Sequence, residues 1–203
     1  MPLFRSKAED KVRKAGYDPA RLPPGQYLTE KWPVLHAGSI PEVDVDTWRM
    51  RVFGLVEEEV TLGFEALRSL PVTEITTDIH CVTRWSRFDT TFRGVHWREL
   101  AKLTRPKPTA RFVIVHAEQG FTSNLPLAAI EADEALIAWE ADGGPLTPDH
   151  GWPLRLVVPS RYFWKSAKWL RGLELRSIDE PGFWERYGYH NDADPWKEER
   201  YGF

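Results

Sequence analysis

The chain has 203 residues, of which 42% are hydrophobic and 28% are charged, and its formal net charge at pH 7 is −3. This size and composition indicate one soluble globular domain, and the small negative charge gives no general attraction for nucleic acid. The single cysteine excludes an internal disulfide and agrees with a reducing compartment. No stretch reaches the roughly 20 apolar residues of a membrane span, and no signal peptide is visible, so the sequence predicts a cytoplasmic protein.

The first half of the chain combines an irregular start with short regular elements. Residues 1–30 are basic and rich in proline, which predicts an extended, poorly regular N-terminal arm. After the arm, apolar and polar residues alternate in two stretches, and this period of two predicts strands. A helix-like segment between them is stopped by Pro71, and the residues after the second stretch have no clear period. The expected elements are a strand at 48–56, a helix at 63–70, a strand at 72–79 and a loop at 81–94.

The second half alternates apolar runs with loops that contain glycine, proline and aspartate. The expected elements are helices at 95–103 and 126–132, strands at 111–116, 135–139, 154–158 and 168–178, and loops at 120–124 and 141–153. Strands outnumber the short helices and do not alternate with long ones. The predicted fold class is therefore α+β, a mixed, β-rich single domain over residues 31–180, rather than a doubly wound parallel sheet. Residues 181–203 form an aromatic tail that we expect to pack on the domain or on a neighbouring subunit.

The only cysteine, Cys81, stands at the end of an expected strand and is followed closely by Arg84 and Arg87. Positive charge beside a thiol favours the thiolate, which attacks electrophiles and binds soft metals. Cys81 is therefore a candidate nucleophile or metal ligand, although a lone cysteine is often an inert part of a core. Arg84 and Arg87 are candidates for thiolate stabilisation or substrate attraction, and the alternative for each is a surface salt bridge.

One alternative function for this segment is that of a cysteine-dependent phosphatase, because five residues separate Cys81 from Arg87. That chemistry needs a loop whose backbone N–H groups surround a phosphate at the start of a helix. The five residues contain no glycine, and the residues after Phe88 do not have a helical pattern, so the match is incomplete. A cofactor-free binding or scaffold protein is the other alternative.

A basic segment near the C-terminus mixes cations with bulky aromatic residues, a combination that suits a phosphate or another anion. Its cations are Arg155, Arg161, Lys165, Lys168, Arg171 and Arg176. Three histidines, His36, His116 and His150, stand at the ends of segments, but their spacing is not that of a zinc or non-haem iron site. The chain has no nucleotide-binding glycine motif and no serine-hydrolase elbow.

Three segments carry a more specific pattern: CVTRWS at 81–86, HGWPLRLVVP at 150–159 and KSAKWL at 165–170. Together they resemble the catalytic domain of the sulfite-oxidase-like molybdopterin oxidoreductases. The resemblance runs from about residue 32 to about residue 184. It is greatest to the bacterial branch that includes the catalytic subunit of the protein-methionine-sulfoxide reductase. It implies the sulfite oxidase molybdopterin-binding fold and a molybdenum–molybdopterin cofactor.

The resemblance also implies roles for the candidate residues. In that family a cysteine thiolate is a direct molybdenum ligand, which makes Cys81 the expected metal ligand here. The segment after residue 150 implies pterin-binding and phosphate-binding roles, and three histidines match positions that contact the cofactor. These implied contacts are Arg155, Ser166, Ala167 and Lys168 for the pterin and its phosphate, and His36, His116 and His150 for the cofactor.

The implied activity is a two-electron oxygen-atom transfer on a small sulfoxide, N-oxide or oxyanion. Because no haem-binding domain is visible, the electrons are expected to come from, or go to, a separate protein or reductant. Two residues depart from the family pattern, and they bear on which substrate is expected. Leu35 stands where sulfite oxidases carry a sulfite-binding arginine, and Thr83 stands where the methionine-sulfoxide branch carries a glutamate. The twin-arginine export signal of that branch is also missing.

Overall fold

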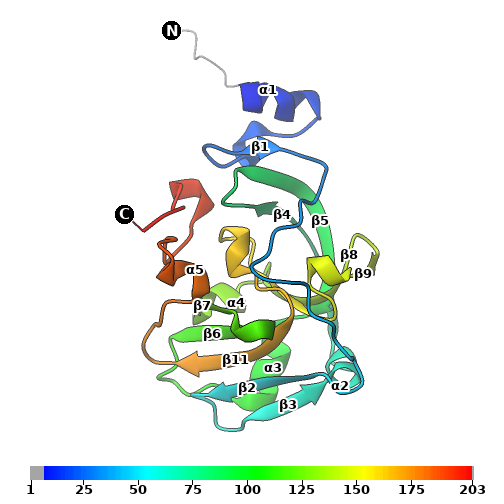
Figure 1. Ribbon diagram of the computed structural model, residues 1–203, viewed down its shortest axis with the longest axis vertical. Helices are drawn as coiled ribbons and strands as arrows, with labels where there is room; N and C mark the ends of the chain where they lie inside the picture. Colours follow the sequence, from blue (N-terminus) through cyan, green and yellow to red (C-terminus); the bar gives the residue numbers. More distant parts are fainter. Residues whose placement is uncertain (1–6, 203) are drawn as a thin grey trace.

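The computed structural model describes residues 7–202, which form two β-sheets with short helices around them (Figure 1). The five-stranded sheet has the order β3-β2-β11-β6-β7, and it consists of β2 (Arg49–Gly54), β3 (Val60–Gly63), β6 (Phe112–Ala117), β7 (Thr122–Pro126) and β11 (Leu170–Arg176). The six-stranded sheet has the order β1-β5-β8-β10, with β4 paired to β5 and β9 to β8. It consists of β1 (Tyr27–Leu28), β4 (Val72–His80), β5 (Trp85–Val95), β8 (Leu136–Ala141), β9 (Gly144–Pro145) and β10 (Arg155–Val157).

The helices are short, as the sequence predicts, and the α+β, β-rich class is confirmed. They are α1 (Lys7–Lys14), α2 (Phe64–Arg68), α3 (Trp97–Thr104), α4 (Leu127–Glu131) and α5 (Phe183–Arg186). Helix α3 shows how local sequence sets the ends of an element. The side chain of His96 caps its start by accepting from the N–H of Arg98, and the chain leaves the helix through Arg105 in a left-handed conformation.

Strand β8 contributes to two hydrophobic cores, because successive side chains of a strand point to opposite faces. Ile137 and Trp139 join a large core with the five-stranded sheet and helices α2, α3 and α4. Leu136 and Ala138 join a smaller core that contains Cys81. Burial on both faces explains why the run over 135–139 is apolar throughout, and it places Cys81 against a well-packed layer.

The structure corrects the prediction for residues 81–94, most of which belong to strand β5 rather than to a loop. The inward positions of β5 alternate phenylalanine with hydroxyl residues, for example Phe88 with Thr90, so the apolar period is interrupted in the sequence. Gly94 is needed near the end of the strand. A Cβ atom there would lie 2.0 Å from the carbonyl oxygen of Ile137 on β8.

Two other regions are more regular than the sequence predicts. The arm contains helix α1 and strand β1, and β1 pairs in parallel with β5. Val12 of α1 is fully buried against Leu28 and Phe88, and this contact explains why helix α1 packs on the domain. The expected loop at 120–124 mostly forms β7, whose polar residues Ser123 and Asn124 are buried and therefore hide the strand pattern.

Candidate active site

The turn between β4 and β5 presents Cys81 at the tip of a hairpin. The N–H of Cys81 donates to the carbonyl oxygen of Trp85 over 2.9 Å, and the N–H of Arg84 donates back to the carbonyl oxygen of Cys81 over 2.9 Å. Arg84 has a φ angle of 77°, which is uncommon for a residue with a side chain. Because a strand rather than a helix follows the turn, it lacks the geometry of a phosphatase phosphate loop.

A cavity of about 560 Å³ opens beside Cys81. Its size is that of a site for a cofactor or a small molecule. The structure brings every predicted cofactor-binding residue except His116 to this cavity, although these residues come from distant parts of the chain. The predicted residues in its lining are His36, Cys81, His150, Arg155, Ser166, Ala167 and Lys168.

Arg155 is a buried cation in the wall of this cavity, with 2% of its surface exposed. Its guanidinium donates to the carbonyl oxygens of His150 at 2.8 Å and Ser166 at 3.0 Å, and it lies 4.3 Å from the ring centre of Phe163. Among residues 7–202 it has no carboxylate partner. Burial lowers the pKa of Arg155 to about 9, so the group is still positively charged at neutral pH. An anion in the cavity would supply the missing counter-charge.

Lys168 places a second amine at the same wall. Its Nζ donates to the carbonyl oxygens of Leu35 at 2.9 Å and Asp149 at 2.8 Å. Burial, assisted by the charge of Arg155, lowers the pKa of Lys168 to about 7. Gly151 makes this packing possible, because a Cβ atom there would lie 3.0 Å from the Cβ of Lys168 and 3.1 Å from that of Arg155. Gly151 therefore allows the side chains of Arg155 and Lys168 to lie side by side at the cavity.

The groups that act on the ionisation of the Cys81 thiol are not the two arginines that follow it in the sequence. Burial raises the pKa of the thiol, and the opposing effects are a hydrogen bond from the Thr83 hydroxyl, 3.1 Å from Sγ, and the charge of Arg200. Arg84 and Arg87 are not among the groups that lower it. The free thiol is thus harder to ionise than an exposed one, and the nearby cation comes from the C-terminal tail.

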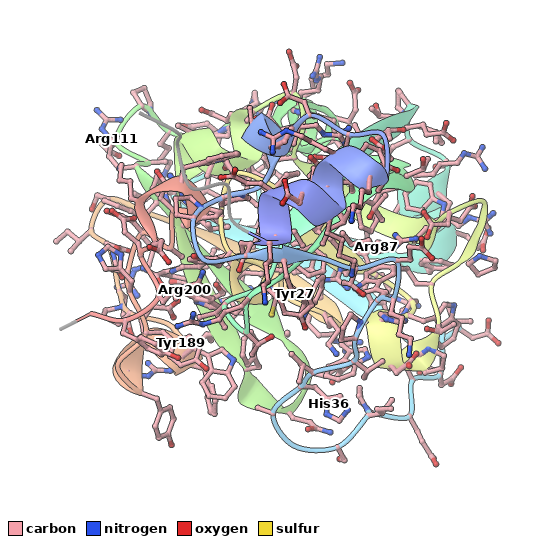
Figure 2. The ribbon with its side chains drawn as sticks, turned by 90° about the horizontal axis from the view of Figure 1, so that it is seen from above. Tyr27, His36, Arg87, Arg111, Tyr189 and Arg200 are labelled. Carbon is pink, nitrogen blue, oxygen red and sulfur yellow. The ribbon has the colours of Figure 1, made fainter. Side chains whose placement is uncertain are left out.

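Three predicted residues lie outside the cavity lining. The side chain of Arg84 is exposed, and it makes no hydrogen bond or ion pair with any residue in the described range. Arg87, labelled in Figure 2, forms an ion pair with Asp142 at 2.7 Å, as the salt-bridge alternative predicts. His116 lies on β6 and bonds Glu174 at 2.9 Å. Arg87 also lies 5.8 Å from the ring centre of Trp32, a residue of the cavity lining, so it borders the cavity through that ring.

The C-terminal tail contributes residues to the site that the sequence did not single out. Phe183, Trp184 and Tyr189 line the cavity, and the rings of Trp184 and Tyr189 stack with centres 5.0 Å apart (Figure 2 labels Tyr189). The hydroxyl of Tyr189 makes no hydrogen bond with the described residues. The density of aromatic residues after 181 was the available signal, but it could not distinguish packing from a role in the site.

A buried ion pair fastens this tail to the domain. Lys165 Nζ lies 2.7 Å from Glu185 Oε1, and these side chains are 0% and 3% exposed. Trp164 also donates to the same oxygen at 2.8 Å, and Lys165 donates to the carbonyl and side-chain oxygens of Asn124 at 2.9 Å each. Burial lowers the pKa of Lys165 although Glu185 opposes the shift. Lys165 thus has a carboxylate partner, whereas Arg155 has none among the described residues.

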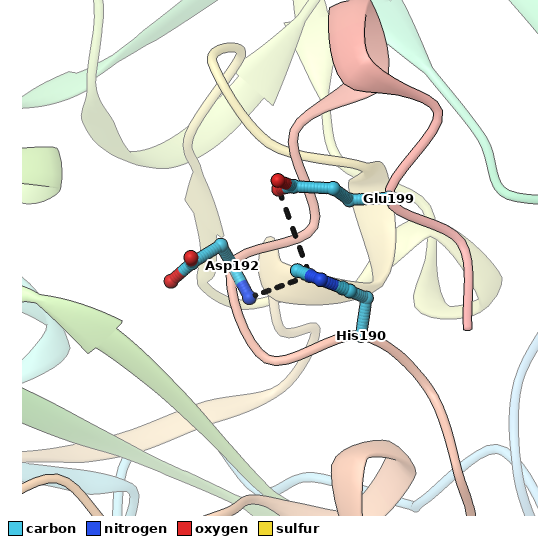
Figure 3. Close-up of side chains that lie close together, drawn as sticks. All are labelled: His190, Asp192 and Glu199. Carbon is cyan, nitrogen blue, oxygen red and sulfur yellow. Dashed lines mark hydrogen bonds and ion pairs between the residues drawn. The ribbon is translucent and has the colours of Figure 1, made fainter. Parts of the chain in front are cut away.

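A second group of side chains in the tail has the composition of a metal site. His190, Asp192 and Glu199 can bring three ligand atoms within 4.8 Å of one another (Figure 3). However, Nδ1 of His190 accepts from the backbone N–H of Asp192 at 3.1 Å, and Glu199 Oε2 accepts from the N–H of Asp194 at 3.0 Å. These bonds cap a turn of the tail, so the group has a sufficient structural explanation.

The comparisons with known proteins identify the architecture around this cavity. The family model described as the oxidoreductase molybdopterin-binding domain matches residues 37–184, which include Cys81 and the whole basic segment. The chain belongs to this family. It is a molybdopterin-dependent oxidoreductase of the sulfite-oxidase-like type, so the predicted family, enzyme class and cofactor are confirmed.

The region that matches this chain makes up almost all of one relative and less than half of the others. The chain is 48% identical over 182 residues to the uncharacterized oxidoreductase YuiH of Bacillus subtilis, covering 89% of this chain and 92% of that protein. It is 28% identical to mitochondrial sulfite oxidase of Rattus norvegicus, covering 82% of this chain but 37% of that protein. The sulfane dehydrogenase SoxCD of Paracoccus pantotrophus has the same fold, with a TM-score of 0.65 and 23% identity, covering 71% of this chain and 42% of the SoxCD chain.

The cavity of this molybdopterin-binding domain fits the cofactor in the chemistry of its lining. A thiol is a ligand for a soft or high-valent metal, and Arg155 is a buried cation that lacks a counter-charge. The phosphatase and scaffold alternatives do not explain this combination. Within the part of the chain that the structure describes, no helix has the length and apolar character needed to cross a bilayer.

Proposed function

We propose that the protein transfers an oxygen atom, together with two electrons, to or from a small sulfoxide, N-oxide or oxyanion. The observation that carries this proposal is the meeting of Cys81, Arg155 and Lys168 at one cavity. In the proposal, Cys81 is the metal ligand, and Arg155 and Lys168 bind the pterin phosphate with help from the Ser166–Ala167 backbone. His36 and His150 contact the cofactor from two loops that meet at Lys168.

When bound, the molybdenum–pterin group supplies the two-electron redox chemistry, and the protein supplies binding, orientation and exclusion of water. Cys81 is suited to its part because a thiol loses its proton on binding a metal, whatever its pKa in the free protein. Arg155 and Lys168 are already held in place by backbone carbonyls, so little side-chain entropy is lost when they meet an anion. Tyr189 offers an unpaired hydroxyl for a hydrogen bond to the substrate oxygen.

Among the three substrate classes, the lining favours an uncharged organic oxide over an oxyanion. Arg155 is the only arginine in the lining, and in this proposal the cofactor uses its charge. Leu35, at the position where the sequence comparison expected an arginine, lines the cavity and is 52% exposed. Several aromatic side chains also line the cavity, among them Trp184 and Tyr189, and such rings bind flat apolar groups.

A substrate panel tests this proposal. Protein from a cofactor-competent host fed molybdate would be assayed with reduced benzyl viologen and methyl phenyl sulfoxide, dimethyl sulfoxide, trimethylamine N-oxide or nitrate, and with ferricyanide and sulfite in the other direction. We expect kcat/KM for methyl phenyl sulfoxide to exceed that for nitrate and sulfite about fivefold or more, since one aromatic contact contributes about 1 kcal/mol.

Trp184→Leu is the matched variant for the panel. It should lower kcat/KM for methyl phenyl sulfoxide about fivefold and affect dimethyl sulfoxide less, because only the aryl substrate uses the ring. A preference for nitrate or sulfite would contradict the substrate assignment, and no turnover of any compound by molybdenum-loaded protein would contradict the function itself.

The electron source or acceptor in this proposal is a separate protein or a small reductant, and the location is the cytoplasm. Titration of the loaded enzyme with candidate carriers from the native cell tests the first statement, with reoxidation or reduction of the enzyme as the readout. Cell fractionation tests the second.

A further inference from the structure

The Cys81 turn is held from behind by both ends of the chain. The side-chain Nε2 of Gln26, in the N-terminal arm, donates to the carbonyl oxygens of Cys81 at 3.1 Å and Trp85 at 3.3 Å. The backbone N–H of Tyr27 donates to the carbonyl oxygen of Arg84 at 2.8 Å. From the C-terminal tail, Arg200 donates to the carbonyl oxygen of Val82 at 2.7 Å.

Arg200 is the centre of this arrangement. It is 7% exposed, and besides Val82 it reaches the side-chain oxygen of Gln26 and the carbonyl oxygen of Pro24, each at 3.2 Å. Its guanidinium also lies 4.9 Å from the ring centre of Tyr162. The planar guanidinium thus bridges the tail, the arm and the turn at once, which the single ammonium of a lysine cannot reproduce. Figure 2 labels Arg200 and Tyr27, which belong to these two chain ends.

We propose that Gln26 and Arg200 form a clamp that fixes the position of the Cys81 turn, so that both are positioning residues for the metal-ligand thiol. This inference rests on the proposed function in so far as Cys81 is the ligand. It accounts for two features that the cavity alone leaves unexplained, namely a buried arginine in a tail remote from the basic segment and the left-handed backbone of Arg84.

The physical basis is the constraint placed on a metal ligand by its surroundings. A left-handed conformation at a residue such as Arg84 persists only where neighbouring groups over-determine it, and hydrogen bonds to four carbonyls of the turn do so. Groups that orient a metal ligand commonly change metal affinity or activity about 10- to 100-fold when they are removed.

The test uses four variants of the full chain. Arg200→Met and Gln26→Ala remove the two clamp side chains, and Arg200→Lys keeps the charge but not the planar fork. Leu100→Ala, in the large core and remote from the turn, is the control for a general loss of stability. Hydrogen–deuterium exchange of residues 81–85 is followed in the cofactor-free protein, and molybdenum content and the Mo(V) EPR spectrum are recorded for the loaded protein.

We expect exchange at 81–85 to rise about tenfold or more in Arg200→Met and Gln26→Ala and to stay near wild type in Leu100→Ala, because only the first two open the turn locally. Molybdenum content should fall about 10- to 100-fold, or the EPR g-values should shift, with Arg200→Lys intermediate. Unchanged exchange in Arg200→Met, or faster exchange with wild-type molybdenum content and spectrum, would overturn the inference. If wild type and Cys81→Ser hold equal molybdenum, the proposed ligand role fails, whereas the exchange data still decide whether the clamp exists.

Discussion

Glu185→Gln should lower the free energy of unfolding of the cofactor-free protein by about 3 to 5 kcal/mol, because it leaves the ammonium of Lys165 buried without a counter-charge. For a chain of this size that corresponds to a fall in melting temperature of about 10 °C. The change also frees the tail that carries Trp184 and Tyr189, so the aromatic wall of the cavity should loosen with it. Chemical denaturation and a thermal melt of wild type and variant measure the effect.

The matched control replaces both members of the pair. The double variant Lys165→Met, Glu185→Leu removes the uncompensated charge and should recover most of the lost stability, since buried ion pairs are often replaceable by apolar residues of similar volume. A loss below about 1 kcal/mol in Glu185→Gln, a size typical of exposed pairs, would show that the pair is hydrated in solution.

Arg155→Met should weaken retention of the pterin about 100-fold, which corresponds to about 3 kcal/mol for removing one partner of a buried charged contact. The expected readout is pterin fluorescence and molybdenum per protein after gel filtration of protein expressed with molybdate. Circular dichroism of the same samples reports whether the variant is folded.

Arg176→Met is the control for this prediction. It removes a cation from the same basic segment, but Arg176 lies at the end of β11, its side chain is 40% exposed, and it pairs with Glu180. It should therefore leave the pterin content unchanged. Equal pterin loss in both variants would point to a general charge effect, and retention of pterin by folded Arg155→Met would contradict the assigned role of Arg155.

Much of the fold could be predicted because its elements carry local patterns. The helix at 97–104 and the strands at 49–54, 112–117 and 170–176 match clear periods or proline boundaries. Strand β5 was missed because its buried face includes Ser86, Thr90 and Gly94, which do not register as apolar residues. This face is buried by residues that are distant in the sequence, such as Val12 in the arm and Leu136 on β8, and no local sequence pattern reports them.

The candidate site could also be predicted only in part. Cys81, Arg155 and Lys168 belong to short motifs, and the structure places them at one cavity. Arg84 and Arg87 were chosen for their closeness to Cys81 in sequence, but Arg84 is exposed in the turn, and Arg87 on β5 pairs with Asp142. Arg200 acts on the thiol from 119 positions further along the chain, as the two residue numbers show, and only the fold brings it there.

The most direct test of the account is the molybdenum and pterin content of wild type and Cys81→Ser, both expressed in a cofactor-competent host fed molybdate. Plasma mass spectrometry gives the metal, and fluorescence of the released pterin gives the organic part. The account predicts near-stoichiometric molybdenum and pterin in wild type, with loss of molybdenum or of turnover in Cys81→Ser, because a serine hydroxyl does not replace the thiolate as a soft ligand. Well-folded wild type without either component, or a Cys81→Ser variant with full molybdenum and full turnover, would contradict it.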